Sequence, residues 1–294
     1  MPVSVAENIT HIAETDENRG RIVLQLSGLG PHPIAIAAVL WIARAFGASL
    51  ESVFVEDEQL LDCAGYGFIK EISLCGQTAR AISSAAMTDD LGVAFRAARR
   101  DIERAALRAG VPHHARVVRG EPLRAVAKAC LERGPWNVVA LADPVRTADV
   151  SVLRSILRQM PGATGVVLVG ASARRVDGPI IVAIEDAGRL AQKLKLAERL
   201  AAEHSTPIVI LPIGARAEQL DILEAQIRLV LDNQDGISIA ACAVTLGSPA
   251  AAADILRRHR PGLVIAELGR IVVPDDSEFR ALIMSLECPL FLVR

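Results

Sequence analysis

The chain has 294 residues and a formal net charge of −2 at pH 7, from 32 basic and 34 acidic side chains. This balance gives no electrostatic reason to expect nucleic acid or an anionic membrane as a partner. Hydrophobic residues make up 51% of the chain and aromatic residues only 3%. That composition argues against disorder and predicts cores of small aliphatic side chains, as in parallel α/β layers.

The first half is predicted to alternate strands and helices after a polar N-terminal leader at residues 1–19. Residues 22–26 read as the first strand, and a glycine- and proline-rich turn leads into a helix over 33–46 that Gly47 ends. Further strands are predicted at 50–55, 113–118, 138–143 and 166–169. Of three further helices, one is predicted to end at Gly110, one to begin at Pro122 and one to span 152–160.

Residues 59–90 have no counterpart in the second half and are predicted to be an insertion. They hold the single tyrosine, Tyr66, and two cysteines, Cys63 and Cys75. The insertion is interpreted either as a lid or partner surface, or as a longer crossover packing on its own domain. Thr88 or Asp89 is expected to cap the helix that follows.

Arginines recur along that helix, mainly off its apolar stripe. We interpret them as a solvated face that pairs with Asp101 and Glu103, and not as an anion site. They are Arg96, Arg99, Arg100, Arg104 and Arg108.

Two stretches of the chain echo each other. VVRGEPLRAVAKACLERGPWNVVALADP, at 117–144, matches VTLGSPAAAADILRRHRPGLVIAELG, at 244–269. The second stretch has Gly247 and Pro249 where the first has Gly120 and Pro122, so the chain is predicted to be a duplication. Strands of the second half are predicted at 180–184, 208–212, 238–244, 263–266 and 290–293, and helices at 190–201, 222–231, 250–258 and 279–286.

Strands that alternate with helices predict an α/β fold, because successive parallel strands need helical crossovers. The expected organisation is two tandem Rossmann-like domains, each a five-stranded parallel sheet flanked by helices. The first domain is expected at 20–170 and the second at 179–294, with a linker at 171–178.

Over residues 20–294 each half resembles a universal stress protein domain. The resemblance rests on the VVxGxP turn before a helix, on strands such as VVALAD, and on the closing ECPLFLV. It implies a sheet in the order 3-2-1-4-5 in each domain, pairing of the two domains through their last strands, and a stress-related regulatory role.

The nucleotide-binding members of that family have an acid after the first strand and a glycine-rich loop after the fourth, whose amides can bind phosphate. Here Ser27 takes the acidic position of the first half, and the loop around Asp143 has no glycine. The second half keeps Glu185 and Gly269, but its loop continues into Asp275 and Asp276, which would repel a triphosphate. Conventional ATP binding is therefore not expected in either half.

The candidate binding residues are those at turns and strand ends where a ligand could lie. Glu185 and Asp186 are open to two interpretations, ligand contact or charge at a helix N-terminus. The turn around His32 could bind an anion or be a plain tight turn. The full set is Ser27, Gly28, Gly30, Asp143, Glu185, Asp186, Gly247 and Gly269. His113 and His114 should point to opposite faces of a strand and so not share a metal.

Five cysteines, at 63, 75, 130, 242 and 288, match neither a disulfide framework nor a zinc site. Reduced thiols in a cytoplasmic protein are expected, and neither a secretory signal nor a spanning helix is predicted. Most of the thiols are interpreted as core residues.

The leading hypothesis is a stress protein with a binding or regulatory role, without catalytic turnover and without a cofactor. Its partner would be an unidentified protein or a small ligand, and a homodimer is possible. The alternative is a protein that binds ATP or AMP and hydrolyses ATP slowly through Glu185, Asp186 and Gly269. A third hypothesis is a thiol-responsive sensor that uses Cys63 and Cys75.

Overall fold

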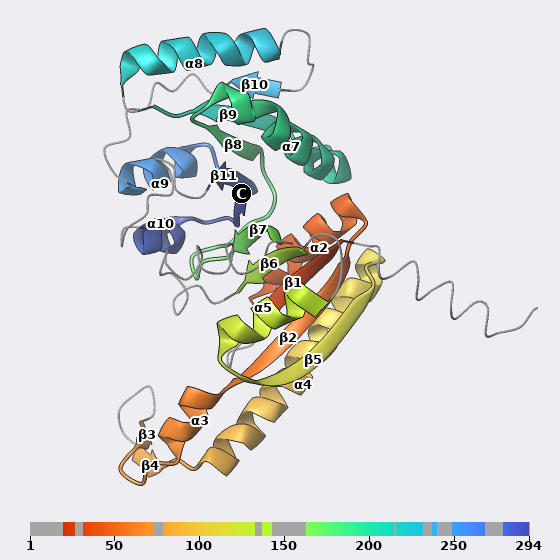
Figure 1. The fold of residues 1–294 in the computed structure, drawn as a ribbon, viewed down its shortest axis with the longest axis vertical. Coiled ribbons are helices and arrows are strands. Elements are labelled where there is room, and N and C mark those ends of the chain that lie inside the picture. Colours follow the sequence, from red (N-terminus) through yellow and green to blue (C-terminus); the bar gives the residue numbers. More distant parts are fainter. Residues whose placement is uncertain are drawn as a thin grey trace, which may run out of the picture.

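One ten-stranded sheet runs through the molecule (Figure 1), in the order β10-β9-β8-β11-β12-β7-β6-β1-β2-β5. The computed structural model describes residues 20–26, 32–72, 79–132, 137–142, 163–214, 216–231, 237–239, 249–267 and 279–293. The two halves of the chain occupy the two halves of this sheet, and the last strand of each lies at the centre. The α/β class with a mostly parallel sheet is therefore confirmed.

Each half contributes five strands that are parallel within that half. The strands of the first half are β1 (Arg21–Leu26), β2 (Ser49–Asp57), β5 (His113–Gly120), β6 (Asn137–Leu141) and β7 (Ala163–Leu168). Those of the second half are β8 (Ile180–Ile184), β9 (Ile208–Pro212), β10 (Ile237–Ile239), β11 (Leu263–Glu267) and β12 (Leu290–Val293).

Helices cover both faces of the sheet, which explains why inner strands such as β8 (IIVAI) and β12 (LFLV) are continuous apolar runs. One core lies beneath α2 (Pro33–Phe46), α4 (Ser84–Ala109), α7 (Leu190–His204) and α8 (Ala217–Val230). The other lies beneath α5 (Pro122–Glu132), α9 (Pro249–Arg258) and α10 (Phe279–Ser285). Along β1 the side chains alternate, so that Ile22 and Leu24 enter the first core and Val23 the second. Each core contains residues of both halves.

The halves meet where β7 and β12 pair in antiparallel fashion. Gly165 stands opposite Val293 in this pairing, and a Cβ atom built on Gly165 would lie 2.5 Å from the Leu292 carbonyl oxygen and 2.7 Å from the Phe291 ring. Phe291 itself is 1% exposed. The close approach of the two strands therefore requires glycine at this position.

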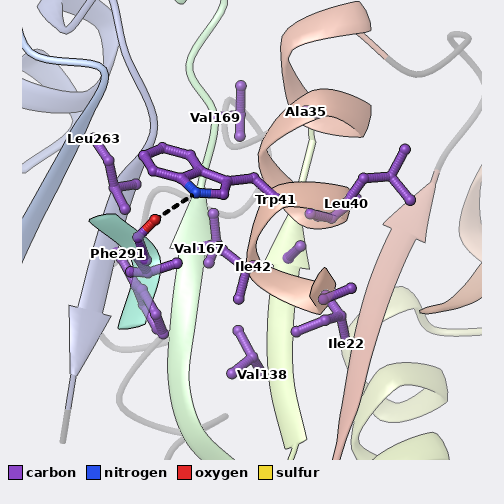
Figure 2. Close-up of a cluster of buried hydrophobic side chains, with 14 of the residues drawn as sticks. Ile22, Ala35, Leu40, Trp41, Ile42, Val138, Val167, Val169, Leu263 and Phe291 are labelled. Carbon is purple, nitrogen blue, oxygen red and sulfur yellow. Dashed lines mark hydrogen bonds between the residues drawn. The ribbon is translucent and has the colours of Figure 1, made fainter. Parts of the chain in front are cut away.

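A second contact between the halves joins α2 to α7. The indole of Trp41 is buried among aliphatic side chains (Figure 2), and its Nε1 donates to the Leu200 carbonyl oxygen at 2.9 Å. Near the end of α2, Arg44 lies 2.9 Å from a carboxylate oxygen of Glu203. A buried indole N–H needs an acceptor, so this contact fixes the angle at which the two helices meet.

The predicted insertion forms a projection at one end of the molecule (Figure 1), containing α3 (Glu58–Ala64), β3 (Lys70–Ile72) and β4 (Ala79–Ala81). Its helix α3 packs against the start of α4, where Ser84 Oγ donates to the Leu61 carbonyl oxygen at 2.7 Å. The two short strands form a separate antiparallel hairpin.

Most predicted elements are confirmed within a few residues, including the helix over Pro33–Phe46 and its end at Gly47, which has a left-handed φ of 59°. The predicted caps of α4 are wrong. Ser83 caps this helix by accepting from the Ala86 N–H at 3.1 Å, and Thr88 lies within it, donating from Oγ1 to the Ser84 carbonyl oxygen. The predicted helix over 152–160 and the end of the strand over 238–244 lie outside the described residues.

Gly165→Ala is expected to destabilise the junction of the two halves, because the added methyl group meets backbone and a buried ring. We expect the free energy of unfolding to fall by about 2 kcal/mol, measured by urea denaturation. Gly67→Ala is the matched control, since a Cβ built there has no atom within 4 Å. Equal stability of the two variants would contradict the close approach.

Candidate functional site

Charged side chains gather at the carboxyl edge of the second half of the sheet. Glu185 and Asp186 directly follow β8, the former half-buried and the latter exposed. Glu267 ends β11, which runs beside β8 so that Glu267 is about level with Ile184. Ligands of open α/β sheets bind outside the carboxyl ends of the strands, so this edge is the candidate site.

Lys193 reaches the same edge from the first turn of α7. Its Nζ donates to the Ala183 carbonyl oxygen at 3.2 Å and lies 3.4 Å from Glu267 Oε2. The side chains of Lys193 and Glu267 are 5% and 12% exposed. A buried ammonium group requires both hydrogen bonding and a counter-charge, and here the strand end and β11 supply them.

We call Glu185, Asp186, Lys193 and Glu267 the carboxyl-edge cluster. Its three carboxylates and one ammonium group carry a formal charge of −2. Such a set attracts cations and polar donors, and it repels an uncomplexed polyphosphate. Among the described residues, however, no group of three or more histidine, cysteine, aspartate or glutamate side chains is arranged to hold a metal ion.

Asp186 has a defined local role in this cluster. Its Oδ1 accepts from the Gly188 N–H at 2.8 Å and so caps the short 3-10 helix η1 (Ala187–Arg189) that precedes α7. This contact agrees with the helix-terminal interpretation of the acidic pair. Ligand contact by Glu185 and Asp186 stays a prediction.

The other predicted binding residues lie outside the described residues. These are Ser27, Gly28, Gly30, Asp143, Gly247 and Gly269. The structure therefore places only the acidic pair of the predicted set, and the two loops that carry the phosphate argument are not described.

Sequence reasoning missed Lys193 and Glu267. Lys193 lies between Leu190 and Ala197 on the apolar stripe of its helix. That stripe faces the core, so a solvated lysine is not expected there. Glu267 directly follows the apolar run 263–266. The sequence did contain a signal for this buried pair. A charged residue lies on an inward-facing helical stripe, and an acidic residue lies at the end of a strand.

The histidines singled out in the sequence have structural contacts. His32 caps α2, with Nδ1 accepting from the Ile34 N–H at 3.3 Å. His113 Nε2 lies 3.0 Å from Ser52 Oγ, and burial lowers the pKa of this imidazole, which favours its neutral form. His114 follows it on β5 and is exposed.

The arginine-rich face of α4 carries the exposed ion pairs expected of it. Arg99 Nε lies 2.6 Å from Glu103 Oε1, and an Arg104 nitrogen lies 2.5 Å from Asp101 Oδ1. All four side chains are exposed, so each pair contributes little to stability. The interpretation of these arginines as a solvated face with helical partners is confirmed for these two pairs.

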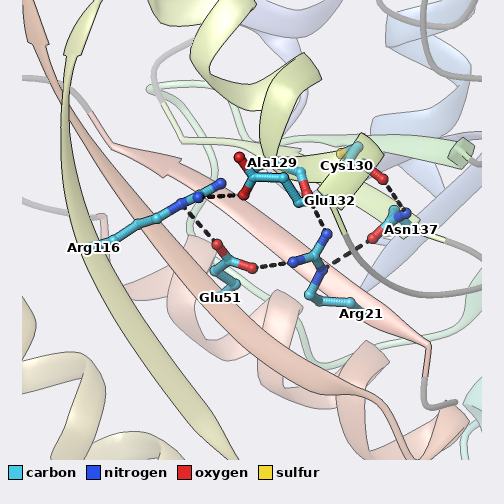
Figure 3. A network of polar contacts seen from close by, with 7 residues as sticks. All are labelled: Arg21, Glu51, Arg116, Ala129, Cys130, Glu132 and Asn137. Carbon is cyan, nitrogen blue, oxygen red and sulfur yellow. Dashed lines mark hydrogen bonds and ion pairs between the residues drawn. The ribbon is translucent and has the colours of Figure 1, made fainter. Parts of the chain in front are cut away.

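A second buried polar network lies at the amino ends of the strands of the first half (Figure 3). Because the two halves run antiparallel to each other across β7 and β12, these amino ends lie along the same edge of the ten-stranded sheet as the carboxyl ends of the second half. Arg21, the first residue of β1, donates to Asn137 Oδ1 at 3.1 Å and also contacts Glu51 and the Ala129 carbonyl oxygen. Asn137 Nδ2 donates to the Cys130 carbonyl oxygen at 3.1 Å. These bonds anchor the end of α5 to the starts of β1 and β6.

Arg116 extends this network towards solvent. It lies 2.9 Å from Glu51 Oε1 and 2.6 Å from Glu132 Oε2. The hydrogen bond from Arg116 lowers the pKa of the Glu132 carboxyl group. The network holds helix ends and strand starts together, and we interpret it as structural.

Comparison with known proteins links this geometry to a fold. No protein-family model and no curated protein matches the sequence. Among solved structures, a universal stress protein from Archaeoglobus fulgidus is 12% identical, with a TM-score of 0.58 over 93% of this chain and 96% of that one. A protein of unknown function from Pseudomonas aeruginosa is 11% identical, with a TM-score of 0.52 over 95% and 94%.

A third solved structure is the cytoplasmic domain of a prokaryotic cation chloride cotransporter. It is 10% identical, with a TM-score of 0.52 over 93% of this chain and 95% of that one. At such identities the likeness shows the fold, which is that of the universal stress proteins, as the sequence resemblance implied. Within the described part of the chain, no helix combines the length and the hydrophobicity that a membrane crossing needs.

Lys193→Met should destabilise the protein by about 3 kcal/mol, because it removes the ammonium group that lies 3.4 Å from the buried Glu267 carboxylate. The double variant Lys193→Met, Glu267→Met should be more stable than this single variant, because it leaves no buried charge of the pair. Lys195→Met, at an exposed position two residues away, is the control and should change stability by less than about 0.5 kcal/mol. Chemical denaturation of the four proteins measures this. A double variant as unstable as Lys193→Met would contradict the coupling of the two charges.

The cysteines should differ in reactivity, because the thiolate is the nucleophile. Cys130 and Cys288 are buried, and burial raises the pKa of each thiol to about 12. Both stay protonated at neutral pH, whereas Cys63 is exposed. Iodoacetamide on the native protein at about pH 8 should therefore modify Cys63 and spare the buried pair, as read by peptide mass spectrometry. Modification of all three at one rate would contradict this, and the same reaction in urea is the control for labelling competence.

Proposed function

We propose that this chain is a universal-stress-protein-like protein that acts by binding, in a regulatory role, and not by catalytic turnover. The proposal includes a cytoplasmic location and an unidentified protein or small ligand as its partner. A similar fold serves as the cytoplasmic domain of a prokaryotic cation chloride cotransporter.

We further infer that the halves are tandem domains, each with its strands in the order 3-2-1-4-5. Support comes from the observed neighbours: β5-β2-β1-β6-β7 in one half and β10-β9-β8-β11-β12 in the other. Under this interpretation the β7–β12 pairing is an interface between two domains of one chain.

The observation that carries the non-nucleotide part of the proposal is the buried ion pair of Lys193 and Glu267. A lysine beside a nucleotide site normally offers its ammonium group to phosphate oxygens. Here the ammonium group is committed to the Ala183 carbonyl oxygen and to a carboxylate of the same protein. Phosphate would have to displace Glu267 and then face a cluster of three carboxylates, which is unfavourable without a bridging cation.

The sequence supports the same conclusion. The loop after the fourth strand of the first half, ADPVRTADVSVLRSIL, contains no glycine, and that of the second half continues after Gly269 as RIVVPDDSEFRALIM. Neither has the spacing of glycines that frees amides to approach phosphate.

The alternative function is slow ATP hydrolysis in the second half. What favours it is the acidic pair Glu185 and Asp186 at a carboxyl strand end, since carboxylates there can hold Mg²⁺ on a nucleotide. Gly269 would be the phosphate-loop residue. This function needs the cation to overcome the negative charge of the cluster.

Titration calorimetry with ATP and with AMP, each with and without Mg²⁺, should detect no binding tighter than about 1 mM. Micromolar affinity in the presence of Mg²⁺ would contradict the proposal and favour the alternative. In that case Glu185→Ala should abolish both binding and phosphate release, whereas Glu198→Ala, an exposed position on α7, should leave both unchanged.

A further inference from the structure

The insertion projects from the body as an ordered arm, which we define as residues 58–72 and 79–90 (Figure 1). Leu61 and Ala64 of α3 are buried against α4, where Leu91 is also buried. Arg80 ties β4 to the neighbouring strand through Glu71 and lies 3.7 Å from Asp90 of α4. These contacts fix the arm to the first turns of α4.

Apolar side chains are exposed at the end of this arm. Tyr66, Phe68 and Ile72 are 55%, 80% and 66% exposed. The rings of Tyr66 and Phe68 stack, with centroids 5.6 Å apart. The chain has a single tyrosine and six phenylalanines, so two stacked, solvent-facing rings on a projection indicate a contact surface.

An apolar groove lies at the other end of α4, between this helix and α2. Its volume is about 630 Å³, and small or aliphatic side chains form its floor. They are Ile36, Ala37, Leu40, Ala105 and Ala109. Small residues leave room for flat rings, and the size is that of a pocket that takes a compact apolar group.

The arm and the groove have opposite charge. The arm carries five acidic side chains and two basic ones, a net charge of −3. The part of α4 from Arg96 to Arg108 carries five arginines and two acids, a net charge of +3. Arg104 and Arg108, together with Asp101, form the rim of the groove. Attraction between such surfaces steers and orients association.

We propose that the arm of one molecule docks in the groove of a second copy, and the reverse, to form a two-fold symmetric dimer. The arm packs at the start of α4 and the groove lies beside its last turns, so the two surfaces are separated along a helix of 26 residues that is about 39 Å long. Two such helices side by side and antiparallel bring each acidic end to the partner's basic end. With the two-fold axis near Ala97, Asp90 of one molecule stands opposite Arg104 of the other, since both lie seven positions from it.

Symmetry is the reason to expect a second copy of this chain in the groove. A two-fold interface must be self-complementary, so that a contact from residue i to residue j recurs from j to i. A molecule that has an acidic aromatic arm at one end of α4 and a basic apolar groove at the other end meets this requirement. Asp90 and Arg104 are 74% and 73% exposed. The ion pairs that they form within one copy, with Arg80 and Asp101, are exposed and therefore weak enough to exchange for a pair across the axis.

Sedimentation velocity on the full chain tests the proposal. The unmodified protein should be a dimer at micromolar concentration. Tyr66→Ser with Phe68→Ser should raise the dissociation constant at least about tenfold. Leu229→Ala removes a similarly exposed side chain from α8, far along the chain, and should leave the constant unchanged. A protein that is monomeric up to about 100 μM, or a dimer that the double variant does not weaken, overturns the proposal.

A charge-reversal series tests the register. Arg104→Asp should weaken the dimer, and Asp90→Arg in addition should restore it, because the reversed pair again has opposite signs across the axis. Failure of the second change to restore association overturns the antiparallel pairing of α4. Circular dichroism of each variant checks that the fold is kept. Nucleotide calorimetry enters neither test, so this proposal can fail independently of the proposed function.

Discussion

The antiparallel pairing of β7 with β12 is the interaction on which the architecture depends. Each half ends in an apolar strand that is buried on both faces, and a strand of this kind cannot remain at an open edge. Pairing the two last strands satisfies both sets of backbone groups at once and makes two sheets into one. Because Gly165 has no side chain, the Phe291 ring can pack directly against the backbone of β7. The buried hydrogen bond from Trp41 to the Leu200 carbonyl oxygen aligns α2 and α7 above the same junction.

Buried charge is used in different ways at the amino ends of the first half and at the carboxyl ends of the second half, which lie along the same edge of the sheet. At the amino edge of the first half, Arg21 donates to several acceptors and Arg116 lies beside two carboxylates, those of Glu51 and Glu132. At the carboxyl edge of the second half, the buried pair of Lys193 and Glu267 lies where β8 and β11 end, next to the acidic residues Glu185 and Asp186 that follow β8. The first set of contacts holds helix ends and strand starts together, whereas the second lies where ligands of open α/β sheets bind.

The order of strands and helices could be predicted because it depends on local patterns. Continuous apolar runs mark β1, β8 and β11, and glycine at position 47 marks the end of α2. The cap of α4 was misplaced because Ser83, Thr88 and Asp89 all suit an N-terminus in isolation, and only the packing of α3 on Ser84 decides among them. Glu185 and Asp186 could be placed from their strand. Lys193 and Glu267 could not be paired, since they are distant in sequence and the sequence holds no direct record of which strand lies beside which.

Joining the halves through their fifth strands leaves β10 and β5 as the two outermost strands of the described sheet. Exposed edges are templates on which other chains can add as further strands, the first step towards amyloid-like growth. β10 is described only over Ile237–Ile239, and β5, which spans eight residues, carries His113, His114, Arg116 and Arg119. The basic side chains along β5 disfavour the addition of a further strand at that edge. The wide sheet that the two halves share thus has an outermost strand whose charge resists aggregation.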